Sequence, residues 1–192
     1  MTHADDEVAA VAGRRPRRAD AQRNCEKIIA AARETFAEGG VSASLEEIAR
    51  RAGVGIGTLY RNFPTRRDLF ETVYRTEVEV LCQAAGELSE RPPWEALDGW
   101  LRRFATYAVT KRAIIEALNH ESAVFEGCRN AIINCGEPLL RRAQEAGEAR
   151  QDATFEDVVR LVGGITMGQF SDPDQVDRVL GMALDGLRAR PR

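Results

Sequence analysis

Three residues between positions 49 and 59 have the types and spacing that a DNA-reading pair of helices needs. Two short helices that meet at a tight glycine turn require small residues where their backbones approach, and an apolar residue that locks their crossing. Ala49, Gly53 and Leu59 meet these requirements at spacings of four and six residues. The second helix of such a unit lies in the major groove of DNA, while neighbouring groups hold phosphates. The spacing predicts a helix-turn-helix over about residues 45–64, although a plain helical hairpin within a bundle would satisfy it equally.

Charge is distributed unevenly along the chain. The net charge is −3, yet residues 14–67 contain 12 Lys or Arg and 6 Asp or Glu, a balance of +6. Residues 68–192 contain 15 Lys or Arg and 21 Asp or Glu, a balance of −6. A basic segment on an otherwise acidic chain is typical of a protein that meets a polyanion with one part only. This distribution places the expected DNA contact in the N-terminal third.

Few residues suggest catalysis. The sequence has two histidines, His3 and His120, and it lacks a glycine-rich phosphate loop, a metal-ligand spacing and a nucleophile motif. We therefore predict that the protein is not an enzyme and that it binds no metal and no cofactor.

The four cysteines are Cys25, Cys82, Cys128 and Cys135, and no two of them have C-x-x-C spacing. A chain of 192 residues does not need disulfides to fold, so we interpret these residues as reduced, mostly buried apolar side chains. The alternative is a redox sensor, for which the pair Cys128 and Cys135 is the candidate because seven residues place both on one helical face.

No targeting segment is recognisable. Residues 1–11 are acidic and polar rather than apolar, and no apolar run approaches the roughly 18 residues that a membrane span requires. We expect a soluble, cytoplasmic protein without a membrane partner.

Helical periodicity extends over almost the whole chain. Apolar residues recur every three or four positions, and no run alternates as a strand would. The predicted fold class is all-α with about nine helices. We expect a flexible basic arm (1–19), a three-helix DNA-binding head (20–65) and a helical bundle for effector binding and dimerisation (66–192). The expected helices span about residues 20–39, 45–52, 56–63, 65–88, 94–104, 114–118, 124–139, 154–165 and 172–187.

Capping residues define several of these helix boundaries. Asp20 is expected to begin the first helix, and Ser44 with Glu47 forms a capping-box pattern before the second. Asp172 followed by proline is a typical start for the last helix, and Pro138 is expected to kink or interrupt the helix that contains it. Further helix starts are predicted at Thr65 with Asp68 and at Thr154 with Asp157, and a loop is predicted at residues 147–153.

A longer stretch of sequence resembles a known family. Residues 45–70, LEEIARRAGVGIGTLYRNFPTRRDLF, closely resemble the helix-turn-helix of the tetracycline-repressor (TetR) family of regulators, and the pattern A-A-x3-F-x-E-G at residues 31–39 is similar to that family's first helix. The resemblance covers about residues 20–75. It implies a head that binds double-stranded DNA at a palindromic operator, a long fourth helix, a helical body that binds a small-molecule effector, and a homodimer formed through the last two helices. Repression, with release by the effector, is the function it implies.

The resemblance also implies roles for individual residues in the head. Base reading falls on Ile56, Gly57 and Arg61, because a guanidinium can contact guanine and an apolar side chain can contact a thymine methyl group. Hydroxyl, amide and guanidinium groups suit phosphate contact. The expected phosphate contacts are Ser44, Thr58, Tyr60, Asn62 and Arg66.

The head departs from the family pattern at three positions. Gly55 replaces the usual capping serine, Asn62 the usual histidine and Arg66 the usual lysine. These departures keep a second function open, in which the protein is a ligand-binding or protein-interaction module of the same fold that no longer binds DNA. The arginines at 14, 15, 17 and 18 would either solubilise the arm or reach the adjacent minor groove.

The C-terminal body offers candidates for an effector pocket and a dimer interface. Pockets between helices are lined by aromatic side chains with a few polar groups, so Trp100, Phe104, Tyr107 and Phe125 are candidate walls, with Asn119 and His120 as possible polar anchors. Apolar stripes and two helical glycines on the last two helices indicate close helix packing about a two-fold axis. The expected interface residues are Phe155, Val159, Val162, Gly163, Val176, Val179, Leu180, Ala183, Leu184 and Leu187.

Overall fold

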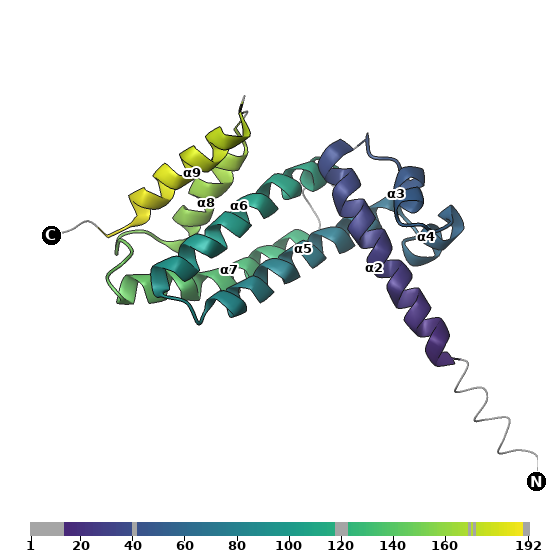
Figure 1. Cartoon of the computed structure of the whole chain (residues 1–192), viewed down its shortest axis with the longest axis horizontal. Coiled ribbons are helices and arrows are strands. Elements are labelled where there is room, and N and C mark those ends of the chain that lie inside the picture. Colours follow the sequence, from purple (N-terminus) through teal and green to yellow (C-terminus); the bar gives the residue numbers. More distant parts are fainter. Residues whose placement is uncertain (1–13, 40–41, 118–122, 169, 171, 190–192) are drawn as a thin grey trace, which may run out of the picture. The chain divides into compact units, whose positions relative to one another are not determined.

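A computed structural model describes residues 14–39, 42–117, 123–168, 170 and 172–189 of the chain. These residues form eight helices and no strand, which confirms the predicted all-α class (Figure 1). None of the described helices combines the length and apolar character of a membrane span. The helices are α2 (Arg14–Gly39), α3 (Leu45–Arg51), α4 (Ile56–Asn62), α5 (Arg66–Leu88), α6 (Pro93–Ala117), α7 (Ala123–Glu145), α8 (Phe155–Thr166) and α9 (Pro173–Leu187).

The difference from the expected nine helices arises in α6. The helices predicted at 94–104 and 114–118 are one continuous helix up to residue 117, because no Gly or Pro separates them. The interruption predicted at Pro138 is also wrong, since α7 continues through this residue. Neighbouring helices can stabilise a helix that has lost one backbone hydrogen bond, and α6 and α8 both pack against α7.

The chain divides into two compact units, Met1–Val73 and Tyr74–Arg192. The division falls inside α5, eight residues beyond the predicted boundary at residue 65. We call these units the head and the body.

The head contains α2, α3, α4 and the first turns of α5 around a small apolar core. Ile28, Phe36 and Ile48 are fully buried, and the ring of Phe36 stacks on that of Phe70 with centroids 3.9 Å apart. Helix α2 begins at Arg14, so the prediction that Asp20 caps it is wrong. Asp20 instead pairs with Arg23 on the helix surface. Pro16 lies in the first turn, where a missing N–H costs no helical hydrogen bond.

Most of the other predicted caps are present. Thr65 and Asp68 exchange hydrogen bonds at the start of α5, and Thr154 and Asp157 do so at the start of α8. The side chain of Asp172 caps α9, with proline at its first position. At α3 the box is half formed: Ser44 Oγ accepts from the Glu47 N–H, but the Glu47 carboxylate binds arginines instead of returning to the cap.

The body consists of the rest of α5 with α6, α7, α8 and α9, and its core is built around Trp100. This indole is fully buried, and its Nε1 donates to the carbonyl of Leu81, 3.1 Å away, which ties α6 to α5. Its ring stacks on that of Phe104, and its centroid lies 5.7 Å from the ring centroid of Phe155 on α8. Helices α8 and α9 pack side by side at one end of the body (Figure 1).

Candidate nucleic-acid interface

The turn between α3 and α4 depends on one glycine. Gly53 has φ of 65°, a left-handed conformation that costs an L-residue roughly 1 kcal/mol or more. The N–H of Val54 donates to the carbonyl of Ala49 at 3.0 Å, and the Gly53 N–H donates to the carbonyl of Arg50 at 3.1 Å. These two bonds close the C-terminus of α3 as a Schellman motif. The position of Gly53 predicted from spacing is therefore confirmed as a tight helix stop.

Leu59 fixes α4 against the head. Its side chain is fully buried, as is that of Ile48 on α3, and Ala49 is buried where the two helices meet. A seven-residue helix that packs through one apolar residue keeps the rest of its surface available to contact other molecules.

Much of the remaining surface of α4 is open to solvent. Ile56 is 39% exposed and Tyr60 46% exposed, although the side chain of Ile56 is wholly apolar and that of Tyr60 largely so. Gly57 and Arg61 are also exposed, and a Cβ at Gly57 would meet nothing within 4 Å. The residues expected to read bases thus share one accessible face of α4.

Polar groups of α4 contact their own helix. Arg61 Nε donates to the carbonyl of Gly57 at 3.1 Å, and its Nη2 donates to Thr58 Oγ1 at 3.0 Å. Asn62 Nδ2 donates to the carbonyl of Thr58 at 2.8 Å. These contacts lay the guanidinium along the helix surface, from which rotation about its side-chain bonds can release it.

Two of the expected phosphate contacts, Ser44 and Arg66, lie outside α4, one on each side of it in the sequence. Ser44 is exposed at the start of α3, and its hydroxyl donates to Glu46 at 2.8 Å, a bond that lowers the pKa of this carboxyl. Arg66 is half-buried at the start of α5, with its guanidinium 5.2 Å from the ring centroid of Phe70. A cation–π contact of this kind restricts the motion of the guanidinium.

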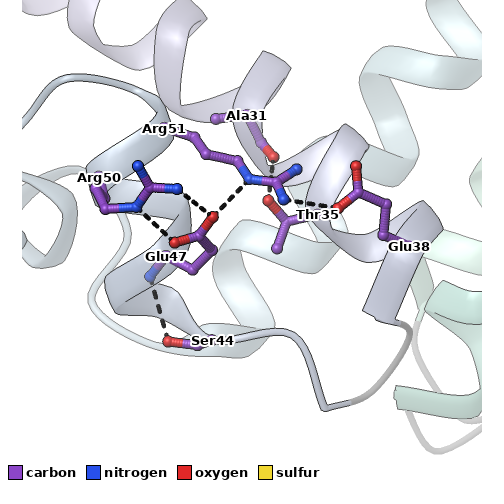
Figure 2. A network of polar contacts seen from close by, with 7 residues as sticks. All are labelled: Ala31, Thr35, Glu38, Ser44, Glu47, Arg50 and Arg51. Atoms are coloured by element: carbon purple, nitrogen blue, oxygen red, sulfur yellow. Dashed lines mark hydrogen bonds and ion pairs between the residues drawn. The ribbon is translucent and has the colours of Figure 1, made fainter.

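An ion-pair network joins α2 to α3 (Figure 2). Arg51 donates to Glu38 on α2 at 2.7 Å and to Glu47 on α3 at 2.8 Å, and Arg50 also binds Glu47. Hydrogen bonds, the larger effect from Arg50 and the smaller from Arg51, lower the pKa of Glu47 to about 2. Spacings of three and four residues within α3 would have predicted the pairs with Glu47. The link to Glu38, thirteen positions away, has no sequence signal.

The body contains a cavity of about 880 Å³ between α6, α7 and α8. Phe104 lines it, whereas the other three predicted wall residues do not appear in its lining. Trp100 lies in the core, and Tyr107 and Phe125 pack on the ring of Tyr74 with centroids 6.1 and 5.1 Å away. The predicted anchors Asn119 and His120 lie outside the described residues. The lining consists of Phe104, Ala108, Lys111, Arg129, Ile132, Ile133, Glu137, Thr154, Phe155, Glu156, Val159, Arg160, Gly163, Thr166 and Met167.

Residues expected at the dimer interface occupy three environments. Phe155, Val159 and Gly163 line the cavity. Val162, Leu180, Leu184 and Leu187 are buried inside the body. Val176, Val179 and Ala183 are half-buried on α9.

Sequence reasoning missed the exposed apolar residues of α8 and α9. Leu161 is 42% and Met182 67% exposed. Gly164 and Gly186 are also exposed, and a Cβ on either would meet nothing within 4 Å. The apolar stripe of α9 was interpreted as a dimer interface, but its leucines, Leu180, Leu184 and Leu187, pack within the protomer.

The cysteines are all free thiols. Burial raises the pKa of Cys25, of Cys128 and of Cys135, the last to about 12. A raised pKa disfavours the reactive thiolate, which favours apolar side chains over a redox sensor. The prediction that most of the cysteines are buried is wrong, because only Cys128 is buried and the other three are half-buried. Among the described residues, no group of three or more His, Cys, Asp or Glu side chains is arranged to hold a metal ion.

Comparison with known proteins places both units in one family. The family described as "Bacterial regulatory proteins, tetR family" matches residues 28–73, and "Transcriptional regulator SbtR-like, C-terminal domain" matches residues 92–189. HTH-type transcriptional regulators of Staphylococcus aureus match over 104 residues, one of them at 38% identity. That alignment covers 53% of this chain and 56% of the relative, so the chain spans about half the length of the curated relatives it matches.

Solved structures extend the similarity to most of the chain. A TetR transcriptional regulator from Streptomyces coelicolor is 43% identical, with 87% of this chain and 99% of that chain covered and a TM-score of 0.76. A TetR transcription regulatory protein from Mycobacterium vanbaalenii is 32% identical, with 90% and 99% covered and a TM-score of 0.70. The helix-turn-helix head, the all-helical body and these matches agree, and the chain belongs to the TetR family of bacterial transcriptional regulators.

Proposed function

We propose that this regulator is a repressor that binds a palindromic DNA operator as a homodimer and is released by a small-molecule effector. The exposed face of α4 supports the DNA-binding role most directly. It presents Ile56, Tyr60 and Arg61 to solvent while the buried side chain of Leu59 anchors the helix in the head. A helix held in this way can enter the major groove without disturbing the core beneath it.

In this proposal some residues of the head contact bases and others contact phosphates. Ile56 and Arg61 contact base edges, and Gly57 lets the helix approach the groove closely because it has no side chain. The phosphate contacts come from α4 itself and from one residue on each side of it in the sequence, which fixes the register of the helix on the duplex. They are Thr58, Tyr60 and Asn62 on α4, Ser44 before α3 and Arg66 at the start of α5.

Selection of bound sequences from a random duplex pool, at near-physiological salt, tests the proposal. Enrichment of a palindrome with half-sites about one helical turn apart supports a dimeric operator reader. Absence of enrichment, together with binding that does not weaken as salt rises, would instead favour the ligand-binding module that has lost DNA binding.

Two arginines of the head should differ in what they do. Arg61→Ala is expected to weaken operator binding by about 1–3 kcal/mol and to relax the preference at one base position, because a base contact is lost. Arg66→Ala is expected to weaken binding to operator and random DNA alike and to reduce the salt dependence, because a phosphate contact is lost. Titrations on both DNAs at two salt concentrations measure these effects. Equal losses on both DNAs for both variants would contradict the division of roles.

The proposed dimer uses α8 and α9. These helices pack on each other, and each leaves one large apolar side chain exposed, Leu161 on α8 and Met182 on α9. The open glycines Gly164 and Gly186 would allow a second copy to approach closely. Two equivalent pairs of helices related by a two-fold axis would form a four-helix interface.

Charge placed on this surface should separate the protomers. The double variant Leu161→Asp with Met182→Asp is expected to sediment as a monomer at micromolar concentration, because two pairs of carboxylates would be buried without partners. Val80→Asp, at another exposed apolar residue of the body, is the matched control and should remain dimeric. A monomeric unmodified protein would refute the dimer, and a dimeric double variant would refute this surface.

Regulation in this proposal works through linkage. An effector that prefers a head arrangement incompatible with the operator weakens DNA binding, typically by about 1–3 kcal/mol. Helix α5 begins in the head and ends in the body, so one element connects the two units. The cavity between α6, α7 and α8 is the candidate effector site.

A further inference from the structure

The wall of the cavity in the body is mainly apolar. Aromatic and branched aliphatic side chains line it from all three helices, among them Phe104 on α6, Ile132 and Ile133 on α7, and Val159 on α8. A volume of about 880 Å³ is within the range of roughly 300–1,000 Å³ that small-molecule sites occupy. The wall therefore suits a molecule whose body is a hydrocarbon chain or ring.

Most charged side chains of the lining are paired or exposed. Arg129 on α7 and Arg160 on α8 both bind Glu156, at 3.0 and 2.9 Å, so one carboxylate partly compensates two guanidinium groups. Glu137 lies exposed on α7. With Lys111 included, the lining contains three cations and two carboxylates.

Lys111 differs from the other charged residues of the lining. It is half-buried on α6, and within the described part of the chain its ammonium has no carboxylate partner, only the ring of Tyr74 with its centroid 5.9 Å away. Burial lowers the pKa of Lys111, and repulsion by Arg129 adds to this. Burial also raises the pKa of Tyr74 to about 12, so at neutral pH the ammonium faces a neutral phenol.

A half-buried ammonium without an acidic partner is poorly compensated for its lost hydration. A ligand carboxylate placed beside it would supply the missing charge in a region of reduced dielectric, where ion pairing is strong. A ligand cation would be repelled by Lys111 and Arg129 together.

We propose that the cavity binds an amphipathic organic monoanion, with its carboxylate on Lys111 and its hydrocarbon body against the apolar wall. This inference rests on the proposed role of the cavity as the effector site, and it adds the chemical class of the effector. Glu137 does not favour the opposite polarity, because an exposed carboxylate keeps its hydration and needs no ligand to compensate it.

Calorimetric titration with two ligands of equal chain length tests the proposal. Decanoate carries the carboxylate and decylamine the ammonium on the same hydrocarbon chain. The chain of residues 1–192 is expected to bind decanoate at least about tenfold more tightly than decylamine. Tighter binding of decylamine, equal binding of the two, or no binding of decanoate up to its solubility limit would each overturn the proposal.

Three variants assign the preference to Lys111. Lys111→Met keeps the length of the side chain and removes the charge, so it should abolish the preference for decanoate. Lys111→Arg should retain it, and Glu137→Gln is the matched control that should leave it unchanged. Retention of the preference in Lys111→Met would overturn the assignment. Circular dichroism shows whether Lys111→Met folds. If it does not fold, the assignment is overturned by loss of the decanoate preference in Lys111→Arg, or by a change of that preference in Glu137→Gln.

DNA binding distinguishes this inference from the function on which it rests. Specific operator binding without any decanoate preference would leave the regulator intact and remove the anion site. A decanoate preference that depends on Lys111, in a protein that selects no DNA sequence, would support the anion site and contradict the proposed operator binding.

Discussion

Replacement of Leu59 by alanine is expected to destabilise the head by about 2–5 kcal/mol, because the side chain is fully buried and its removal leaves a cavity where α4 crosses α3. Urea unfolding followed by two signals can localise the loss. Both tryptophans, Trp94 and Trp100, belong to the body, so their fluorescence reports on that unit, whereas circular dichroism reports on all helices. In Leu59→Ala, helical signal should be lost at urea concentrations where tryptophan fluorescence is still native.

Ile56→Ala is the matched control on the same helix. Because Ile56 is partly exposed, its truncation should cost less than about 1 kcal/mol of stability. At low urea, Ile56→Ala should weaken operator binding more than Leu59→Ala does. Its head is folded, but it has lost a contact with a base. Equal destabilisation by the two substitutions would contradict the anchoring role of Leu59.

Gly136→Ala is expected to destabilise the body by about 1–3 kcal/mol through overpacking. A Cβ at this position of α7 would lie 2.4 Å from Cζ of Phe155 and 2.5 Å from Cη2 of Trp100. Trp100 is fully buried in the core and does not line the cavity, so its ring cannot move aside without displacing its neighbours. Equilibrium unfolding followed by tryptophan fluorescence measures the loss directly.

Gly127→Ala on the same helix separates this clash from the general effect of alanine. A Cβ at Gly127 would meet nothing within 4 Å, so the substitution should stabilise α7 by up to roughly 1 kcal/mol. The two variants should therefore differ in stability by about 1–4 kcal/mol. Stabilisation by both would show that the rings of Trp100 and Phe155 can move aside at little cost.

Gly136 shows why packing requirements were hidden in the sequence. Its neighbours in the sequence do not distinguish it from any other helical glycine of α7. The requirement comes from Trp100, thirty-six positions earlier, and Phe155, nineteen positions later. Which side chains meet across three helices depends on helix rotation and crossing angle, and apolar periodicity defines neither to within one side chain.

The cavity was only partly anticipated for the same reason. Aromatic residues were predicted as walls, yet Trp100 is part of the core and Phe104 lines the cavity, although they are one helical turn apart. The stripe of α8 was assigned to dimerisation, but Val159 and Gly163 face the cavity. Val159 and Gly163 belong to the same small and apolar set as the residues of α8 that pack in the core, so residue type could not tell which of them line a cavity.

The sequence by itself determined the helix-turn-helix, most helix boundaries and the all-α class. Gly53, Leu59 and the capping pairs at Thr65 and Thr154 act through neighbours within about ten positions, so their local geometry follows from residue type and spacing. Only the tertiary structure decided that Arg51 reaches Glu38, that Gly136 has no room for a Cβ, and that Lys111 lines an apolar cavity. These contacts join residues distant in the chain, and their formation depends on the packing of whole helices rather than on any local preference.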